Sequence, residues 1–308
     1  MSRRVSGVAV LVTLAVLASL VPPAAAVVIL DSTWRAQGGA KGREAAGFGA
    51  HVALASEPQF DPVVALGSNE RTWGEASGTW IGNHDGRGYI LTAAHIFDLP
   101  GDPGDYRVRT PGGRVLRADR LWIHADWDGD LEYRTGLDLA VLRLSAPVTD
   151  AGPPPLLYAG DGEAGKLITF VGFGSRGIGS TGEQDRFYRG SHKVAAQGVV
   201  DYWMALVSPS PGDADHGNYL GVFLPREDGG VPNPYGGASK PASPLVGLLG
   251  SGDSGGSAWM RSGAAWVIVG VNSNGTGTAQ YGDTSWFARL APHRRWISGI
   301  VPGVRFVD

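Results

Sequence analysis

The amino-acid sequence predicts an all-β protein, built as a sandwich or a barrel. Short apolar or alternating runs recur along the whole chain, among them GYILTAA, LDLAVLRLS, KLITFVGFG and AAWVIVGVNS. The 48 glycines and 20 prolines are spread between these runs, a pattern typical of many short strands joined by turns. Long segments with the 3.6-residue period of an amphipathic helix are lacking, and the best helix candidate is PHRRWISGIV near the C-terminus.

The length of 308 residues allows one large domain or two of moderate size. A boundary is expected in SAPVTDAGPPPLLYAG, because Pro147 and the prolines at 153–155 interrupt the strand rhythm after Leu144. The chain then divides into residues 27–155 and residues 156–308, two parts of similar size without an internal repeat.

Residues 1–26 have the features of a secretory signal peptide. MSRR places positive charge at the start, Val8–Val21 is an apolar run, and PPAAA offers small residues for cleavage after Ala26. The apolar run is shorter than the roughly 18 residues that a membrane-spanning helix needs. We therefore expect a secreted protein with no membrane partner after cleavage, and a retained membrane anchor is the alternative.

The composition argues against several classes of function. The net charge is -3 at pH 7 and basic residues do not cluster, so nucleic acid is not an expected partner. The absence of cysteine removes thiol nucleophiles and thiolate metal sites, and hints at a bacterial product stabilised by core packing. The acidic stretch DWDGDLE (126–132) departs from an EF-hand loop at Leu131 and Leu137, so a solvated loop is expected there, with calcium binding as the alternative. Neither a metal nor a cofactor is predicted.

The stretch LLGSGDSGGSAWM (248–260) gathers glycine and serine around one acid–hydroxyl pair, Asp253–Ser254. Glycine costs about 0.5–1 kcal/mol relative to alanine inside a regular element, so such a cluster needs a reason. One interpretation is a backbone turn whose free N–H groups bind an anion beside a nucleophilic hydroxyl. The other is a flexible surface loop, and this stretch alone does not decide between them.

A serine nucleophile needs a base, since an alcohol reacts poorly at neutral pH. Of the seven histidines, His95 follows the apolar strand GYILTAAH, whose small residues let an imidazole stand at the edge of a cleft. The base in turn needs a buried carboxylate, and Asp138 precedes the alternating strand DLAVLRL. A structural histidine and a turn aspartate are the alternatives for these two residues.

The segments LTAAH, DLAVLRL and GDSGGS, in the order His, Asp, Ser, resemble the chymotrypsin/trypsin-like serine proteases. SGTWIG, VGFG, VGVNSNG and WFARLAPHRRWI also resemble strands and the terminal helix of that family. The likeness therefore runs from about Gly78 to Ile297, and it is strongest to cysteine-free bacterial members.

This resemblance implies two six-stranded antiparallel Greek-key β-barrels with the active site in the cleft between them and a short C-terminal helix. Residues 27–155 are expected to form the first barrel and to carry His95 and Asp138. Residues 156–308 are expected to form the second barrel, with Ser254 and the helix.

The same resemblance implies a secreted serine endopeptidase that acts on protein or peptide substrates through an acyl-enzyme. Ser254 is expected to attack the carbonyl carbon while His95 takes its proton and Asp138 holds the imidazole. The backbone N–H groups of Gly252 and Ser254 are expected to form the oxyanion hole, where loss of one donor typically costs about 10²–10³ in rate.

The sequence departs from the family at the mature N-terminus, because it has no Ile-Val-Gly-Gly segment. Removal of the signal peptide would expose VVIL, beginning at Val27. The hypothesis is that the amine of Val27 pairs with Asp253, so that export activates the enzyme. The alternatives are a later cut within RAQGGAKGR, or an Asp253 that is satisfied by a side chain.

The specificity pocket is expected from the same alignment of motifs. By position, Leu248 falls at the base of the pocket, Ser273, Asn274 and Gly275 form one wall, and Ser285 stands near the opposite wall. A leucine cannot pair with a cationic side chain, so small or medium apolar residues are predicted before the scissile bond.

Two other functions remain possible on sequence grounds. GDSGG also satisfies the nucleophile elbow of the α/β-hydrolases, and Ser254, Asp283 and His293 fall in that fold's chain order, although the alternating strands and helices are missing. A catalytically inactive binding or adhesion module on the same scaffold is the second alternative. The oligomeric state is left open.

Overall fold

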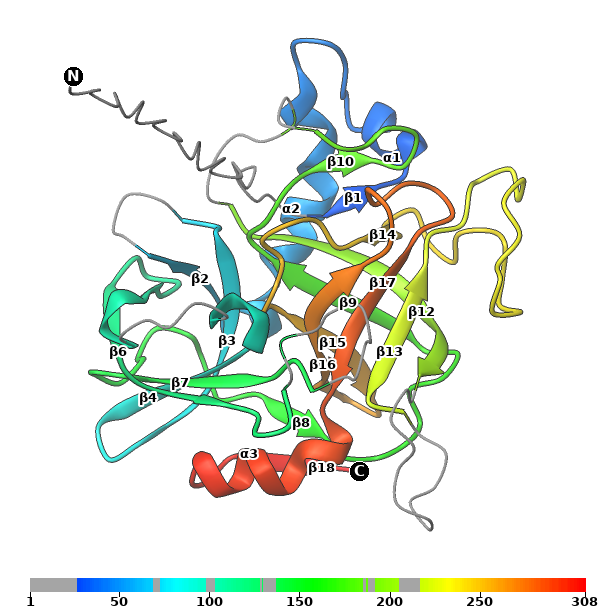
Figure 1. Ribbon diagram of the computed structural model, residues 1–308. Helices are drawn as coiled ribbons and strands as arrows, with labels where there is room; N and C mark the ends of the chain where they lie inside the picture. The colour runs from blue at the N-terminus through cyan, green and yellow to red at the C-terminus, as the bar shows by residue number, and fades with distance from the viewer. Residues whose placement is uncertain are drawn as a thin grey trace, which may run out of the picture.

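The computed structural model contains two closed six-stranded antiparallel barrels that lie side by side (Figure 1). It describes residues 27–68, 73–97, 103–127, 129, 137–184, 187, 192–204 and 217–308. The expected signal peptide, residues 1–26, lies outside the described residues. Among the described residues, no helix has the length and apolar character needed to cross a bilayer.

The first barrel closes in the order β2-β3-β4-β7-β6-β5, with β5 paired back to β2. Its strands are β2 (Val63–Gly67), β3 (Ala76–His84), β4 (Arg87–Thr92), β5 (Arg107–Arg109), β6 (Val115–Ile123) and β7 (Ala140–Leu144). Its interior is filled by apolar side chains from alternate strand positions, among them Val64, Leu66, Ile90, Val108 and Leu142.

The second barrel closes in the order β15-β9-β12-β13-β17-β16, with β16 paired back to β15. Its strands are β9 (Leu167–Gly172), β12 (Val194–Met204), β13 (Tyr219–Phe223), β15 (Ser257–Ser262), β16 (Ala265–Gly275) and β17 (Thr284–Arg289). Two short strands, β8 (Leu156–Tyr158) and β18 (Arg305–Val307), extend this sheet in parallel from β16. The prediction of an all-β fold with two antiparallel barrels is confirmed.

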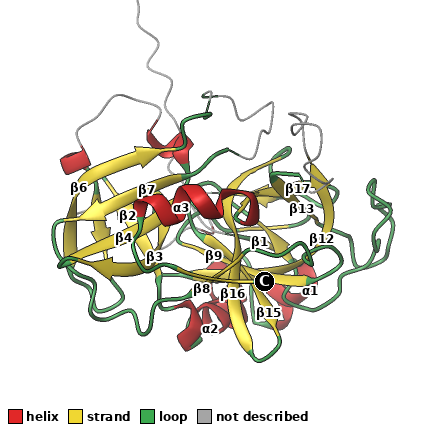
Figure 2. Cartoon of the chain, turned by 90° about the horizontal axis from the view of Figure 1, so that it is seen from below, coloured by secondary structure: helices red, strands yellow, loops and turns green. Residues whose placement is uncertain are grey.

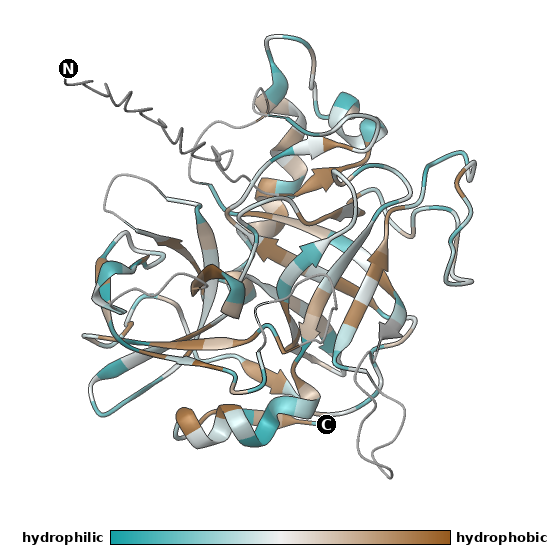
Figure 3. Cartoon of the chain, viewed as in Figure 1, coloured by the Kyte–Doolittle hydropathy of each residue, from teal (hydrophilic) through white to brown (hydrophobic). Residues whose placement is uncertain are grey.

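The two barrels share an apolar interface. One cluster of buried residues joins Ile81 and Leu91 of the first barrel to Val171, Trp259 and Ile268 of the second. Figure 3 shows that apolar residues concentrate in the strands, whereas the long loops are mostly hydrophilic or neutral. Burial of apolar surface stabilises the pair by roughly 25 cal/mol per Å², so the barrels are held together without disulfides.

The segment that follows Val27 packs against the second barrel rather than the first. It contains β1 (Val28–Ile29), α1 (Asp31–Ala36), α2 (Gly49–Ala55) and two 3-10 turns (Glu44–Phe48 and Pro58–Phe60). Strand β1 pairs with β10 (Gly177–Ile178) on one side and with β14 (Gly247–Leu248) on the other, and β10 pairs in turn with β11 (Gly182–Glu183). Helix α2 lies against β12, and buried His51 contacts the carbonyl of Ala195 through Nδ1 at 2.7 Å.

This arrangement differs from the expected assignment of residues 27–155 to the first barrel. The first barrel's strands span Val63–Leu144, and the residues before them cover the second barrel because Val28 and Ile29 complete its outer sheet. The boundary at residues 155/156 itself stays a prediction.

The C-terminal helix α3 (Arg294–Ile300) follows a 3-10 turn (Ala291–His293) and lies at the opposite end of the molecule from α1 (Figures 1 and 2). It crosses back to the first barrel, where the Trp296 ring packs at 5.0 Å from that of His124. His293 Nδ1 lies 3.2 Å from His124 Nε2. Two further 3-10 turns, Ala94–Phe97 and Pro103–Asp105, belong to the first barrel.

Candidate active site

The pairing of β4 with β7 brings His95 and Asp138 together. Thr92, the last residue of β4, is the register partner of Ala140, the first residue of β7. A residue just after β4 and a residue just before β7 therefore lie at the same end of the sheet. His95 sits in the 3-10 turn that follows β4, and Asp138 precedes β7 by two residues.

His95, Asp138 and Ser254 form a continuous chain of hydrogen bonds. His95 Nδ1 lies 2.8 Å from Asp138 Oδ2, and the backbone N–H of His95 donates to Asp138 Oδ1 at 2.8 Å. His95 Nε2 lies 2.8 Å from Ser254 Oγ. The structure thus joins an imidazole and a carboxylate of the first barrel to a hydroxyl of the second.

Asp138 is completely buried and is held ionised by its neighbours. Burial alone would raise its pKa, but attraction to His95 and hydrogen bonds from His95 and Ser273 outweigh burial and lower the pKa. The Ser273 hydroxyl donates to Asp138 Oδ2 at 2.5 Å and also contacts the hydroxyl of Tyr219 at 3.0 Å. The sequence placed Ser273 only in the pocket wall; its contact with Asp138 was missed because the two residues lie 135 positions apart.

The turn that carries Ser254 depends on left-handed glycines. Gly252 has φ +84° and Gly255 has φ +82°, values that other residues rarely adopt. A Cβ on Gly255 would come within 2.0 Å of the Thr92 hydroxyl. No acceptor among the described residues takes the N–H of Gly252 or of Ser254, so both donors remain available beside the Ser254 hydroxyl.

Ser77, on β3 of the first barrel, ties this turn to both barrels. Its N–H donates to the carbonyl of Ser254 at 2.8 Å, and its hydroxyl donates to the carbonyl of Gly252 at 3.0 Å. The same hydroxyl accepts the N–H of Phe173 at 2.9 Å. Nearby, Thr79 donates to the hydroxyl of Ser257 at 2.7 Å. These bonds fix the nucleophile's peptide relative to the histidine's barrel.

Asp253 points away from the cleft into a closed site beneath the turn. Its carboxylate accepts the backbone N–H groups of Val27 at 2.9 Å, Gly250 at 3.0 Å and Gly174 at 3.2 Å. Burial raises the pKa of Asp253 to about 7; the hydrogen bonds from the three backbone amides lower it, and the nearby carboxylate of Glu183 raises it further. The structure brings Val27 and Asp253 together as hypothesised; the free amine stays a prediction.

A cavity of about 480 Å³ opens beside the three reacting groups. The residues that line it are His95, Glu183, Leu249, Gly250, Ser251, Gly252, Ser254, Ser273, Asn274, Gly275, Thr276, Gly277 and Ala279. Of the five expected pocket residues, Ser273, Asn274 and Gly275 lie in its wall.

Leu248 and Ser285 do not line this cavity, which corrects the expected pocket base. Leu248 is the register partner of Val28 in the outer sheet, and its side chain is buried in the core of the second barrel. Ser285 is also buried, and its hydroxyl accepts the N–H of Leu249 at 2.9 Å. Among the described lining residues the one acid is Glu183, at the end of β11, for which the sequence offers no motif.

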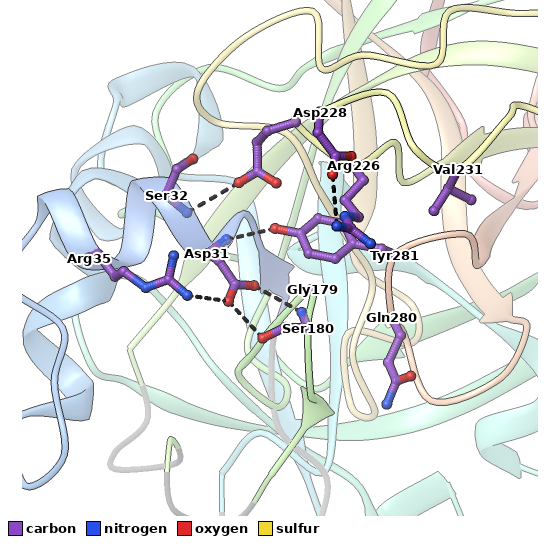
Figure 4. Close-up of a pocket in the computed structure, with 11 residues that line it drawn as sticks. Asp31, Ser32, Arg35, Gly179, Ser180, Arg226, Asp228, Val231, Gln280 and Tyr281 are labelled. Carbon is purple, nitrogen blue, oxygen red and sulfur yellow. Dashed lines mark hydrogen bonds and ion pairs between the residues drawn. The ribbon is translucent and has the colours of Figure 1, made fainter.

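A larger cavity of about 690 Å³ lies elsewhere and is lined by none of His95, Asp138 and Ser254 (Figure 4). Its walls come from α1, the turn after β10, the loop around residues 226–231 and the loop before β17. Asp31 accepts the N–H and the hydroxyl of Ser180, at 2.9 and 2.6 Å, and pairs with Arg35 at 3.0 Å. The Asp31 N–H donates to the hydroxyl of Tyr281 at 2.9 Å.

The structure leaves the acidic stretch 126–132 largely undescribed and is decisive on the α/β-hydrolase alternative. In the acidic stretch 126–132, Asp128, Asp130 and Glu132 lie outside the described residues, and the described ones hold no group of three metal-binding side chains. The two-barrel fold contradicts the α/β-hydrolase alternative, since that fold requires helices between its strands. Its candidate His293 faces His124 rather than the nucleophile.

Comparison with known families agrees with this geometry. Residues 76–219 match the family model of the trypsin-like peptidase domain. The matched segment begins with β3 and ends at the start of β13, so it contains His95 and Asp138 and stops before Ser254. The search among curated proteins gave no match. The family match and the two antiparallel barrels fit a chymotrypsin/trypsin-like serine protease that has no cysteine.

Proposed function

We propose that this chymotrypsin/trypsin-like serine protease is a secreted endopeptidase that hydrolyses peptide bonds through an acyl-enzyme on Ser254. The observation that carries the proposal is the unbroken chain of hydrogen bonds from Asp138 through His95 to Ser254, each close to 2.8 Å. A hydroxyl in contact with an imidazole that is itself oriented by a buried carboxylate is the arrangement that activates an alcohol at neutral pH.

In the first step, Ser254 Oγ attacks the carbonyl carbon of the scissile bond while His95 Nε2 accepts the hydroxyl proton. The carbonyl π electrons move to oxygen, and the N–H groups of Gly252 and Ser254 stabilise the resulting oxyanion. Those donors are already in place and have no acceptor among the described residues, so they need no rearrangement when charge develops.

In the second step, the tetrahedral intermediate collapses, the carbon–nitrogen bond breaks, and His95 gives its proton to the leaving amine. Water then attacks the acyl-enzyme, with His95 again taking and returning one proton, which releases the acid and regenerates Ser254. Asp138 keeps the Nδ1 proton on the imidazole and stabilises the imidazolium through its 2.8 Å bond. Ser273 positions Asp138 from the far side.

Activation is proposed to follow from export. Cleavage after Ala26 would turn the Val27 amide, which donates to Asp253 at 2.9 Å, into an ammonium ion at the same buried position. An ammonium–carboxylate pair would remove the cost of an unpaired charge beneath the nucleophile turn, and that turn would then hold its shape. This supports Val27 as the first residue of the active enzyme.

The proposal is tested by covalent labelling of the secreted protein with a fluorophosphonate, together with cleavage of an unstructured protein such as casein. Label is expected on Ser254 of the wild type and on neither Ser254→Ala nor His95→Ala. Substitution of Ser254 is expected to lower kcat by about 10⁶-fold, as when a reacting serine is removed elsewhere. A folded wild-type protein that neither labels nor cleaves would instead be an inactive binding module on this scaffold.

A further inference from the structure

Among the described residues that line the cavity beside Ser254, Glu183 supplies the one carboxylate. Glu183 ends β11, the second strand of the hairpin formed by β10 and β11. Gly182 before it has φ +68°, and a Cβ there would come within 2.2 Å of the carbonyl of Thr278. The Glu183 N–H donates to that same carbonyl at 3.2 Å. This close contact presses the hairpin against one wall of the cavity and turns the Glu183 side chain into it.

The Glu183 carboxylate is bound by the segment around Ser251, which also lines the cavity. Its Oε1 accepts the backbone N–H of Ser251 at 3.1 Å, and this N–H together with the side chains of Ser251 and Ser175 acts to lower the pKa of the carboxyl group against the effect of burial. The Ser175 N–H donates to the carbonyl of Ser251 at 2.8 Å, which holds these two segments together. Neutral donors therefore fix the position of the carboxylate, while no lysine or arginine among the described residues pairs with it.

Among the described residues, the rest of the lining supplies no lysine or arginine to pair with this charge. Apart from His95 at the mouth, the other eleven lining residues are uncharged: glycine, serine, threonine, asparagine, leucine and alanine. Two titratable groups behind the wall are also acids: Asp253, whose pKa is raised by the nearby Glu183, and Asp283, whose carboxylate lies against Gly277 of the lining. Burial raises the pKa of Glu183, because the carboxylate is partly removed from water and lacks a cation.

A partly desolvated carboxylate without a cation attracts a ligand that supplies one. A volume of about 480 Å³ lies within the range of pockets that take a complete small ligand, so a long side chain fits. Arginine and lysine bury an apolar stem and place their charge at its end. Leu249 and Ala279 in the lining suit the stem, and Glu183 suits the charge.

We propose that Glu183 selects the residue before the scissile bond, and that the enzyme cleaves after arginine or lysine. The assignment rests on the proposed peptidase function and revises the apolar preference expected from Leu248, whose side chain does not enter the cavity. The acid that recognises the substrate comes from the β10–β11 hairpin, on a different segment from the expected pocket base.

The first test compares kcat/KM on peptides that differ only in the residue before the scissile bond: arginine, lysine, glutamine, leucine or alanine. The wild type is expected to prefer arginine and lysine. Glu183→Gln keeps the side-chain shape but removes the charge, and it is expected to lower kcat/KM on the cationic peptides by about 10–100-fold. The same variant is expected to change kcat/KM on the leucine and glutamine peptides by less than about 3-fold.

Glu227→Gln is the matched control, because Glu227 also accepts a backbone N–H, from Ser32, but lines the larger cavity. Its order of preference is expected to equal that of the wild type. A wild type that prefers leucine or alanine, or a Glu183→Gln variant that keeps the arginine preference, overturns the assignment. If the fluorophosphonate still labels Ser254 in those cases, the peptidase proposal stands and only the selectivity proposal fails.

A second test needs no variant at position 183. The ratio of kcat/KM for arginine and leucine peptides is measured against pH with the wild type, and ionisation of His95 cancels because both substrates need it. The ratio is expected to fall as the pH is lowered and Glu183 gains a proton, at a higher pH than an ordinary glutamate would require. A ratio that is constant down to the pH of unfolding contradicts a role for this carboxylate.

Discussion

The cavity beside Ser254 and the larger cavity near Asp31 differ in how their carboxylates are balanced. In the larger cavity (Figure 4), two carboxylates form ion pairs with arginine. Asp31 pairs with Arg35, and Asp228 pairs with Arg226 at 2.7 Å. In the smaller one, Glu183 has only neutral donors among the described residues. Glu227 in the larger cavity also has only neutral donors among the described residues, but their hydrogen bonds outweigh burial and lower its pKa, whereas burial outweighs the donors of Glu183 and raises its pKa. The smaller cavity also holds the N–H groups of Gly252 and Ser254, which have no acceptor among the described residues.

This difference teaches that volume is a weak guide to a reacting site. The groups to which we assign a role in the proposed reaction are instead those left without a protein partner of matching kind among the described residues: the N–H groups of Gly252 and Ser254, which have no acceptor, and the carboxylate of Glu183, which has no cation. The N-terminal segment links the two regions, because Val27 lies beneath the catalytic turn and Asp31, four residues later, lines the larger cavity.

The strongest test of this comparison is to extend the mature N-terminus by two residues, Gly-Ser, before Val27. The Val27 nitrogen then stays an uncharged amide, so Asp253 lacks its cation and the oxyanion turn loses support, while the contacts of Asp31 are unchanged. We expect kcat/KM to fall by at least about 100-fold, comparable to the loss of an oxyanion donor. Active-site titration and peptide hydrolysis measure it; full activity of a form confirmed by mass to be extended would refute activation by export.

A smaller effect is expected on the pH dependence of stability. With an amide partner, Asp253 has a pKa near 7 in the folded state and 3.8 as its ordinary value. Between these pH values the folded extended form binds more protons than the unfolded one, so its free energy of unfolding falls as the pH rises, by up to about 1.4 kcal/mol per unit. A Val27 ammonium stabilises the carboxylate and lessens this fall.

Urea unfolding at pH 4.5 and 7.5 measures the difference, using Ser254→Ala backgrounds to prevent self-digestion. The extended form is expected to lose more stability between the two pH values than the form that begins at Val27. Equal losses in the two forms would mean that the new amine does not reach Asp253.

The smallest effect is expected at the larger cavity. Asp31→Asn weakens the bonds to Ser180 and the partly exposed pair with Arg35, so the free energy of unfolding is expected to fall by about 0.5–1.5 kcal/mol. Because no reacting group is involved, kcat/KM and the preference between arginine and leucine peptides should stay within about 3-fold of the wild type. A change of preference would show that this region does bind substrate.

Much of the fold, and the contact among His95, Asp138 and Ser254, could be predicted from the sequence. Strand rhythm and turn residues indicate β structure locally, and His95, Asp138 and Ser254 each stand in a short segment with a recognisable pattern. The contact among these three side chains depends on the register of β4 with β7 and on the contact between the barrels. The family resemblance implied both features, and the structure shows them.

The pocket could not be predicted in the same way. Glu183 lies in GSTGEQ, which has no periodicity or motif, and it enters the cavity only because Gly182 approaches the distant carbonyl of Thr278. Leu248 was misplaced because counting six residues from Ser254 ignores the strand pairing with Val28 that turns it into the core. Tertiary contacts of two-residue strands leave no trace in local composition.

The hydrogen bonds of Ser77 also affect which feature of the molecule is lost first on heating. Ser77, a residue of the first barrel, donates hydrogen bonds to the carbonyls of Gly252 and Ser254 in the turn of the second barrel. A small displacement of one barrel relative to the other, with both barrels still folded, would move the Ser254 peptide away from His95. For the proposed hydrolysis, we therefore expect mild heating to lower activity before it disrupts the secondary structure.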